Sequence, residues 1–188
     1  MLTIRLMIFW NPTIRDILMP AAPHADIPDI EAQPGHLIRR LQQFAVALFM
    51  DETQGQDLTP VQFAALAAAH RQPGMDQRTL AATIGFDTST TGGVLDRLES
   101  RGLLQRSASA EDRRVRLINL TAAGRHMLQA VTPGMLAAQN RILEPLPQAQ
   151  RRAFMAMLER LVQAHQAHQT THQATHQATR QAGRPGEG

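Results

Sequence analysis

The sequence has 188 residues, about the length of one domain with extensions. Hydrophobic residues make up 43% of it and charged residues 19%, a composition that excludes a wholly disordered or collagen-like chain. The absence of cysteine excludes disulfides, zinc–thiolate sites, iron–sulfur clusters and cysteine nucleophiles. All 19 basic residues are arginine, so mechanisms that need a Schiff-base or phosphate-binding lysine are excluded as well.

Positive charge is concentrated in one segment of the chain. Between Arg97 and Arg125 there are seven arginines and three acids, a local balance of +4, whereas the rest of the chain sums to −1. Nucleic-acid binding requires a local positive face and not a positive average. This segment is therefore the first candidate for contact with DNA.

Residues 1–33 are interpreted as a poorly ordered N-terminal extension. The apolar stretch Leu6–Trp10 is shorter than the roughly 7–15 residues of a secretory signal, although Pro20–Ala25 imitates a cleavage site and leaves that alternative open. No run of the sequence reaches the roughly 18 apolar residues of a membrane-spanning helix.

Two helices are predicted before the basic segment. The first follows Pro34 and Gly35 and has apolar residues at spacings of four, three and four. These residues are Leu37, Leu41, Phe44 and Leu48. Its broad apolar stripe indicates burial both within the subunit and against a partner. Thr59 is predicted to cap the second helix with Pro60 at its first position, and Pro73–Gly74 ends it.

The segment 76–101 has the length and spacing of a helix-turn-helix. We predict a short helix over 76–83 that Gly85 closes, and a second helix over 88–101 that Asp87 opens. The first turns of the second helix are small and polar, although Ser, Thr and Gly are poor helix formers. Such a slim end, rich in hydrogen-bonding groups, is suited to enter a DNA groove.

A β-hairpin wing is predicted to follow. Its strands are Leu103–Ser107 and Val115–Leu120, with a polar turn between them. Thr121 is predicted to cap a long helix, which Pro133 must kink or break.

The last predicted helix starts at Pro147 and ends near His165. Residues 166–188 form a low-complexity tail, rich in His and Gln, that cannot bury a core. If the tail is helical, three histidines align at four-residue spacing and could chelate a divalent ion weakly. They are His168, His172 and His176. The alternative is a solvated extension of the last helix.

Between about residues 34 and 165 the sequence resembles the MarR family of transcription regulators. The most specific match is Asp112–Gly124, where an Asp-x-Arg turn is followed by a strand ending in Leu-Thr and by a glycine three residues later. The other matching stretches are Leu58–Leu66, Leu80–Gly85 and Gly93–Leu104. The resemblance implies a mainly α fold with a small β-hairpin wing, a winged helix-turn-helix whose N- and C-terminal helices form a dimerisation layer.

This resemblance divides the chain into five parts. They are the N-terminal extension 1–33, a dimerisation helix 34–57, the DNA-binding domain 58–122, C-terminal helices 123–165 that complete the dimerisation layer, and the tail 166–188. The residues assigned to the dimerisation layer are Leu37, Leu41, Phe44, Phe154, Leu158 and Leu161.

Short hydroxyl side chains at the start of the second helix of the helix-turn-helix are predicted to read base edges or thymine methyls. They are Ser89, Thr90 and Thr91, and plain N-capping is the alternative interpretation. Gly92 and Arg97 complete the DNA-contacting residues expected on this helix.

In the wing, Asp112 and Arg114 are predicted to brace each other across the tight turn, so that Arg113 is held extended. A guanidinium at that tip can enter a narrow minor groove, where the negative potential is enhanced. Arg114 and Arg116 are further predicted DNA contacts. The alternative is an ordinary solvated turn.

Family members commonly respond to small aromatic acids or phenols bound between the dimerisation layer and the DNA-binding lobe. The run Pro34–Arg40 resembles the opening of the aromatic-acid-responsive members, and His36, Arg39 and Arg40 are the predicted carboxylate clamp. The alternative is that these arginines face solvent or form interface ion pairs. Asp87–Gly93 also resembles the recognition helix of regulators of nicotinate breakdown, which suggests a pyridine carboxylate.

The resemblance thus implies a cytoplasmic, ligand-responsive homodimer. Its symmetry predicts that it binds a pseudo-palindromic operator in double-stranded DNA, with half-sites about 10 bp apart. We expect a repressor released by a small aromatic acid or phenol, with no cofactor, no metal and no catalytic site. Two alternatives stay open: a metal-responsive regulator that uses the histidine tail, and, with less support, a small enzyme.

Overall fold

The computed structural model describes residues 29–112 and 114–182, with side chains described as far as residue 166. The chain divides into two units, residues 1–41 and 42–188. Helix α2 (Pro34–Glu52) begins in the first unit and ends in the second. Among the described residues, none of the helices combines the length and apolarity needed to cross a membrane.

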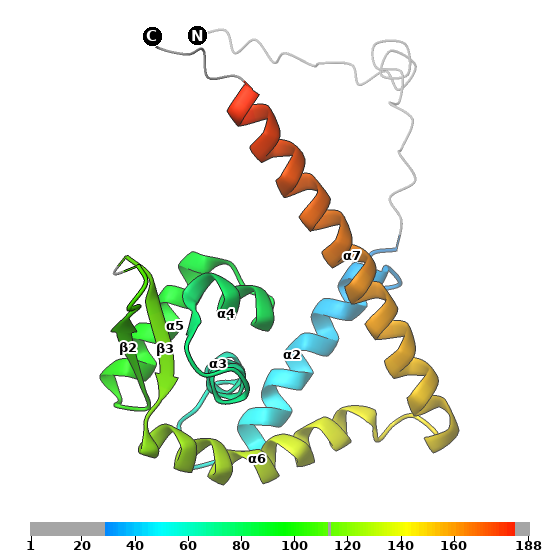
Figure 1. The fold of residues 1–188 in the computed structure, drawn as a ribbon. Helices are drawn as coiled ribbons and strands as arrows, with labels where there is room; N and C mark the ends of the chain where they lie inside the picture. Colours follow the sequence, from blue (N-terminus) through cyan, green and yellow to red (C-terminus); the bar gives the residue numbers. More distant parts are fainter. Residues whose placement is uncertain (1–28, 113, 183–188) are drawn as a thin grey trace, which may run out of the picture. The chain divides into compact units, whose positions relative to one another are not determined.

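Three helices form the centre of the second unit: α3 (Pro60–Arg71), α4 (Gln77–Ile84) and α5 (Thr88–Ser100). Helix α3 contacts α4, α5, the later helix α6 and the sheet, and Figure 1 shows it enclosed by these elements. Helices α4 and α5 are the predicted helix-turn-helix, which is confirmed.

Local hydrogen bonds explain where these helices begin. The hydroxyl of Thr59 accepts from the backbone N–H of Gln62 at 3.3 Å, and the Gln62 side chain accepts from the Thr59 N–H at 3.0 Å, which makes a capping box. Asp76 caps α4 and Asp87 caps α5, each by accepting a backbone N–H at 2.8 Å. Gly85 ends α4 with φ at 74°, a left-handed conformation that glycine adopts without a steric cost.

The sheet has one more strand than the sequence indicates. Strands β2 (Leu104–Ala108) and β3 (Arg116–Leu120) form the predicted wing. A two-residue strand, β1 (Met75–Asp76), pairs with β3 on its other side, and all pairing is antiparallel in the order β1-β3-β2. Two residues are too few for a periodicity to be recognised, so β1 exists only because the fold brings it beside β3.

Helix α6 (Ala122–Leu143) runs unbroken across Pro133. Of the predicted kink or break at this residue, the break is therefore wrong. Contacts that follow the proline hold the helix against the end of α2. A Cβ atom on Gly134 would lie 2.4 Å from the carbonyl oxygen of Glu52, which shows how closely α6 approaches the end of α2. Arg141, further along α6, forms ion pairs with Asp51 and Glu52. Tertiary packing therefore outweighs the hydrogen bond that Pro133 cannot donate.

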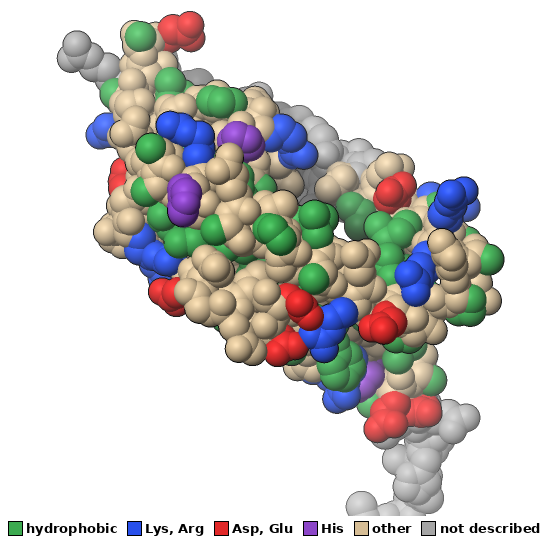
Figure 2. Space-filling model, turned by 90° about the horizontal axis from the view of Figure 1, so that it is seen from below, with side chains coloured by type: hydrophobic (Ala, Val, Ile, Leu, Met, Phe, Trp, Pro, Cys, Tyr) green, Lys and Arg blue, Asp and Glu red, His purple; other side chains and the backbone are tan. Residues whose placement is uncertain are grey.

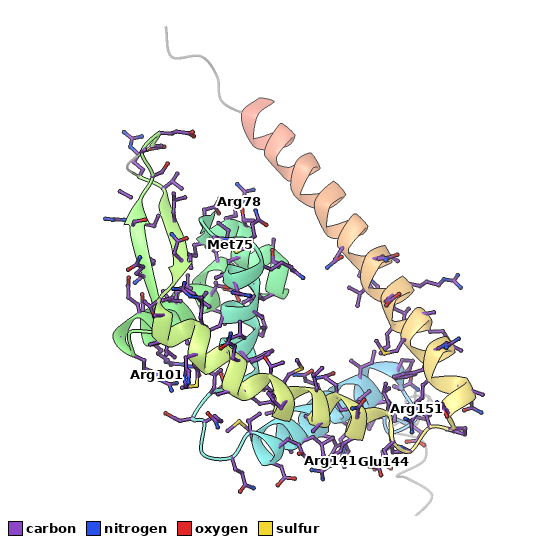
Figure 3. The ribbon with its side chains drawn as sticks, turned by 60° about the horizontal axis from the view of Figure 1, so that its bottom comes forward. Met75, Arg78, Arg101, Arg141, Glu144 and Arg151 are labelled. Atoms are coloured by element: carbon purple, nitrogen blue, oxygen red, sulfur yellow. The ribbon has the colours of Figure 1, made fainter. Side chains whose placement is uncertain are left out.

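Helix α7 (Gln148–Ala182) continues past its predicted end near His165. Its sequence contains no glycine or proline, so nothing in the chain interrupts the helix. The turn before it is held by Arg151, whose guanidinium donates to the carbonyl oxygens of Leu146 and Glu144 at 3.0 and 3.3 Å. Figure 3 labels Glu144 and Arg151 at this turn.

The core of the second unit lies between α3, α4, α5, α6 and the sheet. Its most completely buried large side chains are Leu58, Leu66, Leu80, Leu95, Leu98, Leu104, Ile118 and Val131. Gly124 shows how tightly α6 begins against the sheet, because a Cβ atom there would lie 1.8 Å from the carbonyl oxygen of Leu103. That contact is the physical reason for the glycine three residues after Leu-Thr in the predicted motif.

Candidate nucleic-acid interface

Helix α5 has one buried face and one exposed face. Thr91, Val94, Leu95 and Leu98 point into the core. On the opposite side Ser89, Gly93, Asp96 and Ser100 are exposed. The exposed face is the one available to another molecule.

The position of Thr91 contradicts the prediction that this residue reads base edges. Its side chain is fully buried, and its hydroxyl donates to the carbonyl oxygen of Asp87 at 2.8 Å. A threonine at this position satisfies its hydroxyl inside the helix and packs its methyl group against the core. It cannot reach a base edge.

Ser89 and Thr90 are both exposed, as a base-reading role requires. The Thr90 hydroxyl donates to Asp87 at 2.6 Å and its backbone N–H donates at 2.8 Å, so the capping alternative also applies to it. These two hydrogen bonds hold the pKa of Asp87 below its ordinary value of 3.8, and the bond from the hydroxyl has the larger effect. Because the Thr90 proton is engaged, its oxygen is left as an acceptor.

The two glycines of α5 differ in their surroundings. A Cβ atom on Gly92 would lie 3.1 Å from Nε2 of Gln77, and that amide donates to the carbonyl oxygen of Thr88 at 3.0 Å. Gly92 therefore makes room for the contact between α4 and α5. A Cβ atom on Gly93 would meet nothing within 4 Å. The chain itself gives no reason for glycine at 93, although glycine weakens the helix.

Arginines lie around this helix. Arg97 is exposed on α5, and Arg78 is exposed in the first turn of α4, on the side away from α6 (Figure 3). Arg97 was predicted from the sequence to contact DNA, whereas Arg78 was not. The signal was available, because the first helix of a helix-turn-helix crosses the DNA backbone and Arg78 occupies its first turn.

The wing turn is braced differently from the prediction. Oδ1 of Asp112 accepts from the backbone N–H of Arg114 at 2.9 Å, and among the described residues Asp112 and Arg114 form no side-chain ion pair. In a tight turn the amide two residues away is the nearest donor to the carboxylate. Arg113 lies outside the described residues. Arg114 and Arg116 are exposed.

One arginine links the wing to α5. Arg106 of β2 donates from Nε to Glu99 at 2.8 Å and from Nη2 to Asp96 at 2.7 Å, and its backbone N–H also donates to Glu99 at 3.0 Å. The Arg106 side-chain hydrogen bond is the main reason that the pKa of Glu99 falls below its ordinary value of 4.5. The same contacts raise the pKa of Arg106. This link was not predicted from the sequence.

The face of the molecule drawn in Figure 2 carries arginine and acidic side chains interspersed with apolar ones. Among the residues shown in colour there, no continuous basic surface forms. The exposed face of α5 in the winged helix-turn-helix is therefore a better candidate for binding DNA than the face drawn in Figure 2.

Comparison with known proteins agrees with this geometry. The model of the MarR family matches residues 58–115. The chain is 29% identical over 143 residues to the transcriptional repressor NicR of Pseudomonas putida. The aligned region covers 76% of this chain and 90% of NicR. The structure of BpsR from Bordetella bronchiseptica has a TM-score of 0.68 and 30% identity, with 72% of this chain and 96% of BpsR covered. This chain belongs to the MarR family.

A DNA-bound relative has the same fold. CouR, a repressor from Rhodococcus jostii, has been solved with a 23-mer DNA duplex. That structure has a TM-score of 0.65 and 30% identity, with 69% of this chain and 92% of CouR covered. The winged helix-turn-helix of this MarR-family chain is therefore a DNA-binding fold, and the predicted fold class is confirmed.

The predicted effector clamp lies on α2, in the first unit of this MarR-family chain. His36 is half-buried, whereas Arg39 and Arg40 are exposed. Their spacing of three and four residues places them on one side of the helix. A carboxylate clamp formed by these three residues stays a prediction.

The residues assigned to the dimerisation layer are apolar and largely exposed in the single chain. In the first unit Leu37 is 56% exposed and Leu41 is 37% exposed. In the second unit Phe44 and Leu161 are more than half exposed. Phe154 and Leu158 are half-buried. Large apolar side chains that stay exposed in a single chain mark a surface for another protein.

Proposed function

We propose that this MarR-family chain is a transcription repressor that binds a pseudo-palindromic operator as a homodimer and releases it when a small aromatic acid binds. The observation that carries the proposal is the exposed face of α5, small and polar around Ser89 and Gly93, beside an arginine-bearing wing. In the proposed complex α5 lies in the major groove and the wing contacts the neighbouring minor groove. In this complex Ser89, Thr90 and Arg97 face the bases, and the wing arginines contact the minor groove.

A homodimer is supported by the exposed apolar residues of α2 and α7. Two identical surfaces related by a two-fold axis are the commonest way to bury such a face. A two-fold dimer carries two copies of α5, so its operator is pseudo-palindromic. Such a repressor acts in the cytoplasm, and its proposed activity is binding rather than catalysis.

The proposed effector class is supported by the predicted clamp on α2 and by one relative. The DNA binding of BpsR is regulated by 6-hydroxynicotinic acid. For this chain we propose a pyridine or benzene carboxylate, whose carboxylate pairs with Arg39 and Arg40 while His36 donates a hydrogen bond. Binding releases DNA by favouring a dimer whose recognition helices no longer match the groove spacing.

The proposal is tested by titrating the purified protein against the intergenic DNA upstream of its own gene, at several salt concentrations and with unrelated DNA as competitor. We expect tight binding that survives the competitor and falls steeply with salt. Adding 6-hydroxynicotinate or nicotinate should then release the DNA, whereas benzyl alcohol, which lacks the carboxylate, should not. Binding that unrelated DNA removes equally well, on this fragment and on fragments selected genome-wide, would refute the proposal.

A further inference from the structure

Arg106 connects the wing to two carboxylates of α5. It reaches Asp96 and Glu99, which lie three residues apart on the helix, with side-chain donors to both and a backbone donor to Glu99. The Arg106 side chain is 25% exposed, whereas the Asp96 side chain is 66% exposed. The arginine is thus largely enclosed, while one of its carboxylate partners faces solvent.

The position of Asp96 makes this contact significant. Asp96 lies on the exposed face of α5, close along the helix to Gly93 and Arg97. An unpaired carboxylate on that face would repel the DNA phosphates. Helix α5 carries two acids and one arginine, a net charge of −1, and Arg106 brings this group to zero.

We infer that Arg106 is a positioning residue for DNA binding, which neutralises Asp96 on the DNA-facing side and joins the wing to α5. This inference rests on the proposed DNA-binding function. Because the guanidinium donates in several directions at once, one residue can hold β2 against α5 and screen both carboxylates. The wing and the recognition helix then meet DNA with fixed spacing and without a net negative charge between them.

The experiment compares the full-length wild type with R106Q, D96N, the D96N/R106Q double variant and R106K. Operator affinity is measured at several salt concentrations, and the melting temperature of each variant is recorded. We expect R106Q to weaken operator binding about tenfold, since it exposes a negative charge near several phosphates. The double variant should regain most of that affinity, because Asp96, the more exposed of the two carboxylates, no longer carries a charge. R106K, which keeps the charge, should bind more tightly than R106Q.

The matched control is R101Q. Arg101 caps the end of α5 and pairs with Asp57, so this variant also removes one positive charge near the helix without exposing Asp96. Its loss of affinity should be smaller than that of R106Q.

The outcomes separate the inference from simpler explanations. Unchanged operator affinity in R106Q would overturn it. A lowered melting temperature with no recovery of affinity in the double variant would show a purely structural contact and would also overturn it. A wild type that never prefers its operator over competitor DNA would refute the proposed function itself, a result distinct from the other two.

Discussion

Helices α5 and α7 differ in how much of their apolar surface a single chain covers. In α5 the apolar residues are enclosed, with Leu95 and Leu98 completely buried, and the exposed face is small and polar. In the described part of α7 no side chain is fully buried, and Leu161 and Val162 are more than half exposed. The packing of α5 is thus complete within one subunit, whereas that of α7 needs another surface. The difference separates residues that serve the fold from those that serve assembly.

The largest effect is expected in the core beneath α5. Leu95→Ala leaves a cavity in a fully buried site and should lower the free energy of unfolding by about 2–5 kcal/mol. Urea unfolding followed by circular dichroism measures it. Thr90→Ala, at an exposed position of the same helix, is the control and should cost much less. Equal losses in the two variants would contradict the burial of one face.

The next effect concerns the apolar face of α7. Leu161→Asp places a charge in the proposed dimer interface, so the protein should become monomeric and lose operator affinity by roughly 100-fold, because the two half-sites are no longer bound together. Light scattering gives the mass and a DNA titration gives the affinity. Gln163→Asp adds the same charge on the opposite side of the helix, where Gln163 is exposed, and should leave the dimer intact. A dimeric Leu161→Asp variant would show that this face serves another purpose.

At Gly93, on the exposed face of α5, one substitution should change stability and DNA binding in opposite directions. Gly93→Ala should raise the free energy of unfolding by about 0.5–1 kcal/mol, since alanine favours the helix and its Cβ meets nothing in the chain. It should nevertheless weaken operator binding, because the added methyl group prevents the helix backbone from approaching the base pairs closely.

The control for Gly93 is Gly35→Ala. Gly35 is a helical glycine on α2 that also has no neighbour within 4 Å of a built Cβ. That variant should keep wild-type operator affinity when no effector is present. If Gly93→Ala binds the operator as tightly as the wild type, close approach of DNA at this residue is excluded.

The smallest expected effect is on the pH dependence of stability. Hydrogen bonds from Thr90 lower the pKa of Asp87 in the folded protein, so its contribution is present above the ordinary value of 3.8 and is lost as the pH falls through the lowered pKa. Asp87→Asn keeps a capping acceptor but does not titrate. Acid unfolding should therefore be slightly less steep in this variant than in the wild type. An unchanged acid transition would mean that the cap contributes nothing to it.

Much of the candidate interface was predictable, because it depends on residues close together in the sequence. The exposed positions of Ser89 and Arg97 follow from the apolar spacing of α5, and the caps at Thr59 and Asp87 are made by donors three residues away. Thr91 was misassigned although the same spacing, three and four residues before Val94 and Leu95, places it on the buried face. The Arg106 link spans ten residues and two elements, so no local pattern reveals it.

The helix-turn-helix, the wing and most helix ends could be predicted from the sequence, since these features depend on hydrogen bonds and apolar periodicity over a few residues. Tertiary structure alone decided the rest. Strand β1 exists because Met75 pairs with Ile118, and α6 crosses Pro133 while its flanking contacts hold it to the end of α2. Both depend on partners more than forty residues away along the chain, and a pairing at that distance leaves no periodicity to read.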